Sequence, residues 1–470
     1  MTAPLKKPHR GMPKGRVASL DNIEELRSIL GPVTEQRDLL IEHLHCIQDA
    51  LGHLPARLLV ALAEEMRLST VEVYEVATFY HHFDVVKEGE TPPPDLTVRV
   101  CDSVSCCLHG AEALIRELQK NLGDDVRVQR VPCVGRCASA PVAVVGTAPV
   151  SEANTDKVQQ AINRGQTQDS ASIYHQSYTA YRKYGGYSLL QRLCDDDGTL
   201  AEKVLSTMEN SGLRGLGGAG FPAGRKWRIV RGYKGPRLMA VNIDEGEPGT
   251  FKDRFFLERD PHRFLDGMLI AAKVVGVEEI YIYLRDEYAG IRLLLQRELA
   301  DLRADPPCSQ PLPVIHLRRG AGAYICGEES AMIESIEGKR GMPRQRPPYI
   351  AEVGLFGRPT LEHNMETLYW VRQIAESGPD WFASQGENDR HGLRSFSVSG
   401  RVKKPGVHIA PAGITMSDLL EEYCGGMQGG HAFKAYFPGG VSGGILPASL
   451  AHIPLDFDTL QPYGCFIGSA

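Results

Sequence analysis

The sequence predicts a multidomain protein of mixed α/β and α+β class. Its 470 residues exceed one ordinary hydrophobic core. Between residues 96 and 145, strand and helix patterns follow one another in the order β-α-β-β. Such patterns alternate again over residues 196–390, and the chain then changes to glycine-rich strand segments. These three observations indicate several cores rather than one.

The N-terminal part is expected to begin with a tail and continue with helices. Residues 1–30 start with a basic stretch and are expected to be a flexible tail. Apolar residues recur at helical spacing over 34–51, and a second helix is expected over 56–67. Ser69 and Glu72 have the spacing of a capping box, which predicts the start of a third helix.

Period-two patterns follow the Pro-rich break near residue 93. LTVRVC, VRVQRV and PVAVV alternate like strands, and GAEALIRELQKNL is helical. Residues 161–195 are polar and are expected to be a linker on the surface. SFSVSGRV and the KKPGV turn predict a small β domain over 391–470, arranged around one helix, MSDLLEEY.

Composition excludes some classes of function. Hydrophobic residues make up 42% and charged residues 23%, which is normal for a globular protein. No apolar run approaches the roughly 20 residues that span a bilayer. The net charge of −6 gives no reason to expect nucleic-acid binding. We therefore expect a cytoplasmic protein with no membrane span and no nucleic-acid partner.

Four cysteines are spaced as metal ligands. Cys101 and Cys106 form one pair, and Cys133 and Cys137 form another. A [2Fe–2S] cluster needs four thiolates, two for each iron, and paired ligands on separate loops meet that need. Structural zinc is the alternative, because it also accepts four cysteines at short spacing. Cys107 adjoins a ligand and competes with Cys106 for that role.

A glycine loop lies at residues 215–220, where the sequence satisfies G-x-G-x-x-G. A dinucleotide-binding fingerprint should follow a strand, whereas this loop follows a helical pattern, AEKVLSTMENSGL. An ordinary Rossmann site is therefore disfavoured. The glycines still allow the backbone to approach a phosphate or a flat ring closely, and a flexible surface loop is the alternative.

Residues 35–150 resemble the thioredoxin-like [2Fe–2S] subunit of respiratory complex I. The resemblance rests on VEVYEVATFYHHF, VCDSVSCCLHGAEAL and PCVGRCASAPV. It implies a helical hairpin plus a thioredoxin-like ferredoxin domain over 31–160. It also implies that Cys106, and not Cys107, is the ligand.

Residues 200–470 resemble the flavin- and NADH-binding subunit of complex I, a module also present in NAD-linked hydrogenases and formate dehydrogenases. SGLRGLGGAGFPAGRKW, VNIDEGEPGTFKDR, RRGAGAYICGEESAMIESIEGKRGMPR and GLFGRPTLEHNMET carry this resemblance. It implies an FMN- and NAD-binding α/β domain over 196–390. The domain over 391–470 would then be β-grasp-like, of the soluble-ligand-binding-β kind.

The resemblance also implies roles for individual residues. Phe221 would stack on the nicotinamide, and Glu247 and Glu329 would be the other catalytic candidates. These three residues would also bind FMN or NAD, together with Gly215, Gly217, Gly218, Gly220, Lys226, Asn242, Asp244, Glu245, Tyr324, Gly327, Glu328, Asn364 and Thr367. The metal ligands would be Cys101, Cys106, Cys133 and Cys137.

The fusion of both modules resembles the β subunit of bacterial NAD-dependent molybdenum or tungsten formate dehydrogenases. LMAVNIDEGEPGTFKDRFFLERDPHRFLDGML, IYLRDEY and FPGGVSGGILPASL look especially like that branch. The implied partner is a large α subunit that holds the Mo/W-pterin and iron–sulfur clusters. The alternatives are a diaphorase subunit of an NAD-linked hydrogenase, a complex I component, a scaffold that only relays electrons, and a zinc-stabilised interaction protein.

In the family that the chain resembles, a helical domain with a Cys-x-x-Cys-x-x-Cys motif and a [4Fe–4S] cluster follows. No Cys-x-x-Cys occurs in these 470 residues, and YGCFIGSA follows what reads as the start of an apolar strand. A further domain with that cluster is therefore expected beyond Ala470, and a short form of the protein is the alternative.

Overall fold

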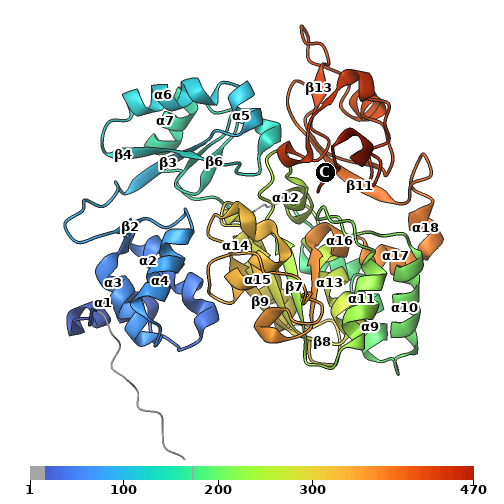
Figure 1. Ribbon diagram of the computed structural model, residues 1–470, viewed down its shortest axis with the longest axis horizontal. Coiled ribbons are helices and arrows are strands. Elements are labelled where there is room, and N and C mark those ends of the chain that lie inside the picture. Colours follow the sequence, from blue (N-terminus) through green and yellow to red (C-terminus); the bar gives the residue numbers. More distant parts are fainter. Residues whose placement is uncertain (1–15, 172–173, 470) are drawn as a thin grey trace, which may run out of the picture. The chain divides into compact units, whose positions relative to one another are not determined.

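Two structural units make up the described part of the chain, which is residues 16–171 and 174–469 of a computed structural model (Figure 1). One unit holds Met1–Pro93 together with Glu337–Arg340. The other holds Pro94–Ile336 and Gly341–Ala470. The second unit contains two four-stranded sheets and a small C-terminal β domain, so the predicted α/β and α+β class is confirmed.

The first unit consists of helices and one short parallel strand pair. Its elements are α1 Leu20–Leu30, η1 Arg37–Leu39, α2 Leu40–Leu51, β1 Leu54–Pro55, α3 Ala56–Glu65, α4 Thr70–Phe79 and β2 Val85–Val86. The predicted capping box is confirmed, because the Glu72 amide donates to the Ser69 hydroxyl and the Ser69 amide donates to Glu72. The Tyr80 hydroxyl donates to the Lys339 carbonyl at 2.8 Å, which joins Glu337–Arg340 to this unit.

The expected flexible tail is wrong for residues 20–30, which form α1. Ser19 caps this helix by accepting from the Asn22 amide, and Leu26 is fully buried. Arg27 also pairs with Glu65 of α3 at 2.9 Å. The segment is mostly polar, so its one buried apolar residue, Leu26, gave little indication of a packed helix. Residues 1–15 of the expected tail lie outside the described residues.

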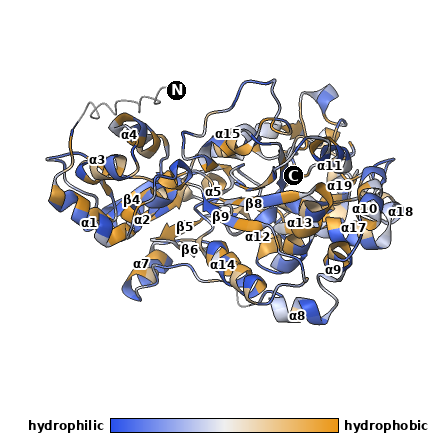
Figure 2. Cartoon of the chain, turned by 90° about the horizontal axis from the view of Figure 1, so that it is seen from below, coloured by the Kyte–Doolittle hydropathy of each residue, from blue (hydrophilic) through white to orange (hydrophobic). Residues whose placement is uncertain are grey.

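The first sheet of the second unit has the order β4-β3-β5-β6. Its strands are β3 Leu96–Cys101, β4 Val126–Val131, β5 Ala143–Val145 and β6 Ala148–Val150. β3 and β4 are parallel, and β5 and β6 run antiparallel. Helices α5 Val104–Leu108, α6 Ala111–Asn121 and α7 Thr155–Asn163 belong to the same domain, and α7 carries hydrophobic and hydrophilic residues side by side (Figure 2). The predicted β-α-β-β order is confirmed.

The second sheet is fully parallel and has the order β10-β7-β8-β9. Its strands are β7 Arg237–Ile243, β8 Val277–Leu284, β9 Val314–Arg319 and β10 Thr360–Asn364. The chain forms β8 and then β9 on one side of β7, and it then returns to form β10 on the other side of β7. This reversal creates a switch point at the carboxyl ends of β7 and β10, where open α/β sheets place their ligands.

Helices cover this parallel sheet and complete the core. They are α8 Tyr178–Lys183, α9 Ser188–Cys194, α10 Thr199–Asn210, α11 Ala223–Gly232, α12 Lys252–Leu257, α13 Pro261–Val275, α14 Ala289–Ala304, α15 Glu329–Ile336, α16 Met365–Tyr369, α17 Val371–Ser377 and α18 Pro379–Ala383. Asp260 caps the almost fully buried helix α13. Among the described residues, no helix combines the length and the apolar character needed to cross a bilayer.

The expected surface linker at 161–195 is wrong in its second half. Tyr178, Tyr181 and Tyr187 are buried in the same hydrophobic cluster as the central sheet. Their rings cover apolar neighbours while their hydroxyls find buried partners, so a segment that reads as polar forms part of the core. Residues 172 and 173 of the expected linker lie outside the described residues.

The C-terminal domain contains two antiparallel pairs. β11 Leu393–Val398 pairs with β12 Gly406–Pro411, and β13 Ala435–Tyr436 pairs with β14 Leu446–Pro447. The predicted helix is present as α19 Met416–Asp418, followed by a wider π-type turn at Leu419–Tyr423. The strand expected to begin just before Tyr463 is wrong: residues 451–460 form turns and bends with one isolated bridge at Pro454, and Gln461–Tyr463 form a 3₁₀ helix. Cys465 and Ile467 are buried in this domain's core.

A buried carboxylate links α8 and the turn before it to the core. Glu298 of α14 accepts from His262 and from His175, both at 2.8 Å, and from the Tyr178 amide at 3.1 Å. Burial alone would raise the pKa of Glu298, but the hydrogen bonds from His262 and His175 lower it to about 2. The carboxylate is therefore charged and fully engaged at neutral pH.

Replacement of Glu298 by alanine should lower the free energy of unfolding by about 3–5 kcal/mol, because it leaves buried donors without a partner. Denaturation followed by tyrosine fluorescence and by calorimetry measures this loss. Asp301→Ala, at an exposed position of the same helix, is the control and should change stability little. Equal stability of the two variants would contradict the assigned role.

Candidate functional site

A cavity lies at the switch point between β7 and β10. Asn242 and Asn364 are register partners at the ends of these two strands. The loops that follow β7 and β9 meet the glycine loop and the C-terminal domain here, around a volume of about 280 Å³. The lining residues are Gly217, Gly218, Asn242, Asp244, Glu245, Gly246, Glu247, Lys252, Asp253, Tyr324, Ile325, Gly327, Glu328, Asn364, Gly439, Ser442, Phe466, Gly468 and Ser469.

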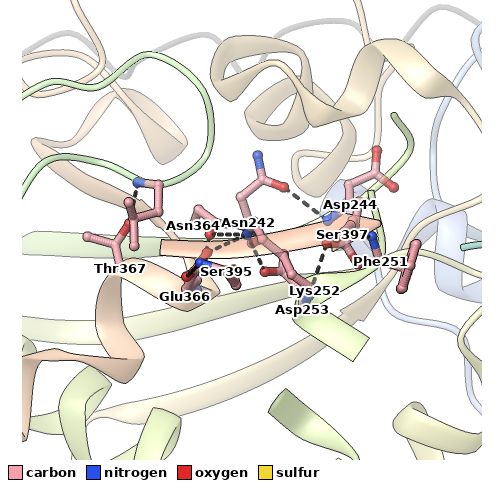
Figure 3. A network of polar contacts seen from close by, with 12 residues as sticks. Asn242, Asp244, Phe251, Lys252, Asp253, Asn364, Glu366, Thr367, Ser395 and Ser397 are labelled. Atoms are coloured by element: carbon pink, nitrogen blue, oxygen red, sulfur yellow. Dashed lines mark hydrogen bonds and ion pairs between the residues drawn. The ribbon is translucent and has the colours of Figure 1, made fainter. Parts of the chain in front are cut away.

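Lys252 is the buried cation of this cavity (Figure 3). Its Nζ atom lies 2.7 Å from Asp253, 3.1 Å from Glu366 and 3.1 Å from the Asn364 side-chain oxygen. Burial by itself lowers the pKa of Lys252, but Asp253 and Glu366 raise it above its ordinary value. The ammonium is therefore charged, and it fixes Asn364 at the wall of the cavity.

Two acids that follow β7 line the cavity, and they differ in their hydrogen-bond partners. The Oδ2 atom of Asp244 is buried and has no hydrogen-bond partner among the described residues. Burial raises the pKa of Asp244 to about 7. The Glu245 carboxylate accepts from the Asp253 amide at 3.0 Å and from the Tyr288 hydroxyl at 2.8 Å. An unpartnered buried oxygen at a cavity wall is suited to accept a hydrogen bond from a bound ligand.

Glu247 joins two segments at the cavity wall. The Tyr324 hydroxyl donates to Glu247, and so do the Ser442 amide and hydroxyl, both at 2.8 Å. Tyr324 belongs to the segment after β9, whereas Ser442 belongs to the C-terminal domain. Glu247 therefore holds the C-terminal domain against the edge of the central sheet.

The glycine loop approaches the cavity closely. A Cβ atom at Gly217 would lie 2.9 Å from the Asn364 Cβ atom, and Gly218 has a φ of +113°. Both positions therefore require glycine. The Leu216 amide donates to the Thr367 hydroxyl at 2.9 Å, which ties the loop to α16. The predicted helix before this loop is present as α10, so the loop does not follow a strand.

Several residues predicted for the site lie outside this cavity. Phe221 is 38% exposed, and the Arg225 guanidinium lies 5.7 Å from its ring centroid. Lys226 pairs with Glu362 at 3.0 Å, and Glu329 pairs with Arg346 at 2.9 Å. Gly215, Gly220 and Thr367 also do not line the cavity. The structure thus brings ten of the predicted cofactor-binding residues together around one volume, and they are Gly217, Gly218, Asn242, Asp244, Glu245, Glu247, Tyr324, Gly327, Glu328 and Asn364.

The four predicted metal ligands are all buried in the first sheet's domain. Cys101 ends β3, Cys106 lies in α5, and Cys133 and Cys137 lie after β4. The Cys133 and Cys137 sulfur atoms are 3.3 Å apart, and Cys101 interacts with both Cys106 and Cys133. Cys107 is exposed, and its thiol donates to the Asp102 carbonyl at 2.9 Å. Four buried thiols that converge on one point match the donor set of a [2Fe–2S] cluster or of zinc.

Sequence reasoning missed Gly246, Ile325 and two groups of lining residues. Lys252 and Asp253 stand inside the quoted motif VNIDEGEPGTFKDR, so their spacing from β7 was a usable signal. The second group comes from the C-terminal domain, and it is Gly439, Ser442, Phe466, Gly468 and Ser469. A separate domain contributes these residues, and no local pattern indicates which cavity it faces.

Two family models match the chain. The Nuo51 FMN-binding domain matches residues 208–373, and the thioredoxin-like [2Fe–2S] ferredoxin matches residues 26–166. The first match spans the central sheet and the glycine loop, and the second spans all four clustered cysteines. The chain thus carries an FMN-binding domain and a [2Fe–2S] ferredoxin domain, and the predicted FMN and [2Fe–2S] cofactors are confirmed at the level of these domains.

Curated relatives match over most of their own length. An NADH-quinone oxidoreductase chain of Rhizobium meliloti is 40% identical over 299 residues, which are 62% of this chain and 70% of that protein. The alpha chain of the NAD-reducing hydrogenase HoxS of Cupriavidus necator is 34% identical over 435 residues, which are 84% of this chain and 71% of that protein.

Solved structures give the same result. Two crystal structures of NAD⁺-reducing [NiFe]-hydrogenase, in the H₂-reduced and the air-oxidised state, match with TM-scores of 0.74 and 0.76 at 30% identity. Each match covers 93% of this chain and about three quarters of the other. The chain therefore belongs to the family of FMN- and NADH-binding, diaphorase-type subunits that includes the complex I subunit of the 51 kDa type, here with a thioredoxin-like [2Fe–2S] domain on the same chain.

Proposed function

We propose that this chain is the NAD-reducing subunit of an NAD-dependent formate dehydrogenase and that FMN binds in the cavity between β7 and β10. The observation that carries the placement of FMN is the set of convergent polar groups at the switch point. When bound, FMN exchanges a hydride with nicotinamide and single electrons with iron–sulfur clusters. The role of the protein is to bind, orient and shield.

The cavity fits a flavin in three respects. Gly217 and Gly218 leave room for a flat ring or a phosphate because neither carries a side chain. The Asp244 Oδ2 atom lacks a partner that a ligand hydroxyl or N–H group would supply. The Asn242 amide nitrogen donates to the Gly327 carbonyl at 2.9 Å, which holds both walls together.

The residues around the cavity have separable roles in this proposal. Asn242, Asp244 and Asn364 orient the flavin. Glu247 and Tyr324 position the nicotinamide at the mouth of the cavity. Phe221, which is exposed, is available to stack on the nicotinamide. Lys226 and Glu329 interact electrostatically with each other.

The acids at this site favour NADH over NADPH. Asp244, Glu245, Glu247 and Glu328 line one cavity with Lys252 as the buried cation. An additional 2′-phosphate would bring negative charge toward these carboxylates, and like charges repel.

The choice of formate dehydrogenase rests on three segments typical of that branch, of which LMAVNIDEGEPGTFKDRFFLERDPHRFLDGML and FPGGVSGGILPASL contribute residues to the wall of the cavity. The partner would be a large α subunit that oxidises formate at a Mo/W-pterin centre and passes the electrons to this chain. A diaphorase subunit of an NAD-reducing hydrogenase is the second candidate, because the hydrogenase alpha chain of Cupriavidus necator aligns over 84% of this chain.

Affinity for FMN should depend on the charge of Asp244. The unpartnered carboxylate accepts hydrogen bonds best when ionised, so FMN and a proton compete for it. Below the raised pKa of about 7, the dissociation constant of FMN should rise by up to about tenfold per pH unit. Asp244→Asn should bind FMN with little dependence on pH over the same range. Fluorescence titration of the FMN-free protein from pH 5 to 8 measures both, and the same pH slope in the variant would refute the assignment.

The four buried cysteines should hold one [2Fe–2S] cluster. Cys133→Ser should lose or distort the electron paramagnetic resonance signal of the dithionite-reduced protein, because a serine oxygen is a poorer ligand than thiolate. Cys107→Ser is the matched control, since its thiol is exposed and bonds only to a backbone carbonyl. Iron and acid-labile sulfide analysis separates this cluster from zinc. An unchanged signal in Cys133→Ser would disprove the ligand assignment.

The identity of the partner decides between the two candidate functions. The complex purified under native conditions should reduce NAD⁺ with formate as donor, and its large subunit should contain molybdenum or tungsten. Hydrogen-dependent NAD⁺ reduction with nickel in the partner would instead establish the hydrogenase subunit. NADH-dependent reduction of an artificial acceptor should occur in both cases, and its absence in an FMN-loaded protein would refute the diaphorase activity itself.

A further inference from the structure

The turn after β8 lies between the clustered cysteines and the cavity. This turn, Arg285–Tyr288, is the end of the segment IYLRDEY. Arg285 is 4% exposed and Tyr288 is 1% exposed. Neither residue lines the cavity. Neither would ligate the iron–sulfur cluster, so the proposed function gives no role to either side chain.

Arg285 bridges two loops through its guanidinium group. One terminal nitrogen donates to the Cys133 carbonyl at 2.6 Å, and the other donates to the Glu245 carbonyl. Glu287 balances the charge at 3.1 Å. A planar guanidinium reaches two carbonyls in fixed directions, which a lysine ammonium does not do. The cluster loop and the loop after β7 therefore share one rigid donor.

Tyr288 makes a second bridge between the same loops. Its hydroxyl donates to the Glu245 carboxylate at 2.8 Å, on the side of the loop that faces the cavity. The same hydroxyl lies against Gly135, where an added Cβ atom would be only 2.2 Å away. Gly135 has a φ of +69°, and its carbonyl accepts from Arg254 at 3.1 Å. Glycine at position 135 thus permits the contact with the tyrosine.

We propose that Arg285 and Tyr288 are positioning residues for electron exchange between the flavin cavity and the cysteine cluster. They hold the Cys133–Cys137 loop at a fixed distance and orientation from the loop that carries Glu245. Flavin that NADH has reduced would be oxidised by one electron at a time, and one ferric iron of the oxidised [2Fe–2S] cluster would accept that electron and become ferrous. This inference rests on the proposed function, because it requires a flavin in the cavity and a cluster on the four cysteines.

Two conservative variants and a control test this role in the purified complex. Tyr288→Phe removes only the hydroxyl, and Arg285→Lys keeps the charge but loses the double donor. Tyr281→Phe is the matched control, because its hydroxyl also donates to a glutamate, Glu279 at 3.1 Å, on the same strand. FMN content, iron content and thermal stability establish that each variant is folded and loaded.

Rapid-mixing experiments with NADH follow flavin bleaching and cluster reduction separately. Tyr288→Phe and Arg285→Lys should leave flavin bleaching nearly unchanged and slow cluster reduction by about tenfold, the factor that corresponds to about 1.4 kcal/mol in a barrier. Tyr281→Phe should match the wild type in both steps. Cluster reduction at the wild-type rate in both test variants, or equal slowing of both steps, would overturn the proposal.

A spectroscopic measurement keeps this test independent of the proposed function. The dithionite-reduced cluster in Tyr288→Phe and Arg285→Lys should show shifted electron paramagnetic resonance g-values, because the Cys133 loop changes its surroundings. Unshifted g-values in both variants would count against the positioning role of Arg285 and Tyr288. If NADH fails to bleach the flavin in the wild type while dithionite still yields the cluster signal, the proposed diaphorase activity is refuted. In that case the g-values alone test the positioning role of Arg285 and Tyr288.

Discussion

The rest of the site depends on the ion pairs and the hydrogen bond of the buried Lys252 ammonium. A charge removed from water is costly unless partners surround it, and Lys252 has Asp253, Glu366 and the Asn364 oxygen within 3.1 Å. Glu366 in turn accepts from the Ser395 amide of β11, so the same cluster holds the C-terminal domain. One cation thereby orients the loop after β7, the start of α16 and the neighbouring domain.

The loop between β7 and α12 lies between the cavity and the clustered cysteines. On one side, Asp244, Glu245 and Glu247 line the cavity. On the other side, Phe251 is packed against Cys133 and Cys137, and its amide donates to the Ser397 hydroxyl at 3.1 Å. The eight residues 244–251 thus run from the wall of the cavity to the clustered cysteines, and Phe251 is 2% exposed. Short, dry and rigid contact is what transfer of single electrons requires.

Much of this arrangement could be predicted from the sequence, and the exceptions have physical reasons. Periodicity identified the strand LTVRVC and a helix over 34–51, of which the structure has Leu40–Leu51 as α2 after the 3₁₀ turn Arg37–Leu39. Paired spacing predicted the cysteine ligands, and the family resemblance selected Cys106 over Cys107. The tyrosines at 178, 181 and 187 were assigned to a surface linker because the segment is polar. Their rings are buried in the core, and residues distant in the sequence bond the hydroxyls of Tyr181 and Tyr187. Ser442 and Phe466 reach the cavity only through domain packing, which no local pattern encodes. Strand order, which creates the switch point, is likewise a long-range property.

The C-terminal domain closes a cavity whose other walls are built far earlier in the chain. Gly439, Ser442, Phe466, Gly468 and Ser469 form that last wall. With FMN in this cavity as proposed, a growing chain has no complete binding site until residue 469 has emerged from the ribosome and its domain has folded. Under this proposal, FMN binding would follow the synthesis and folding of residues 391–469. A cell that tests for bound flavin before assembling the complex would, by the same measure, be testing whether this domain is folded and in place.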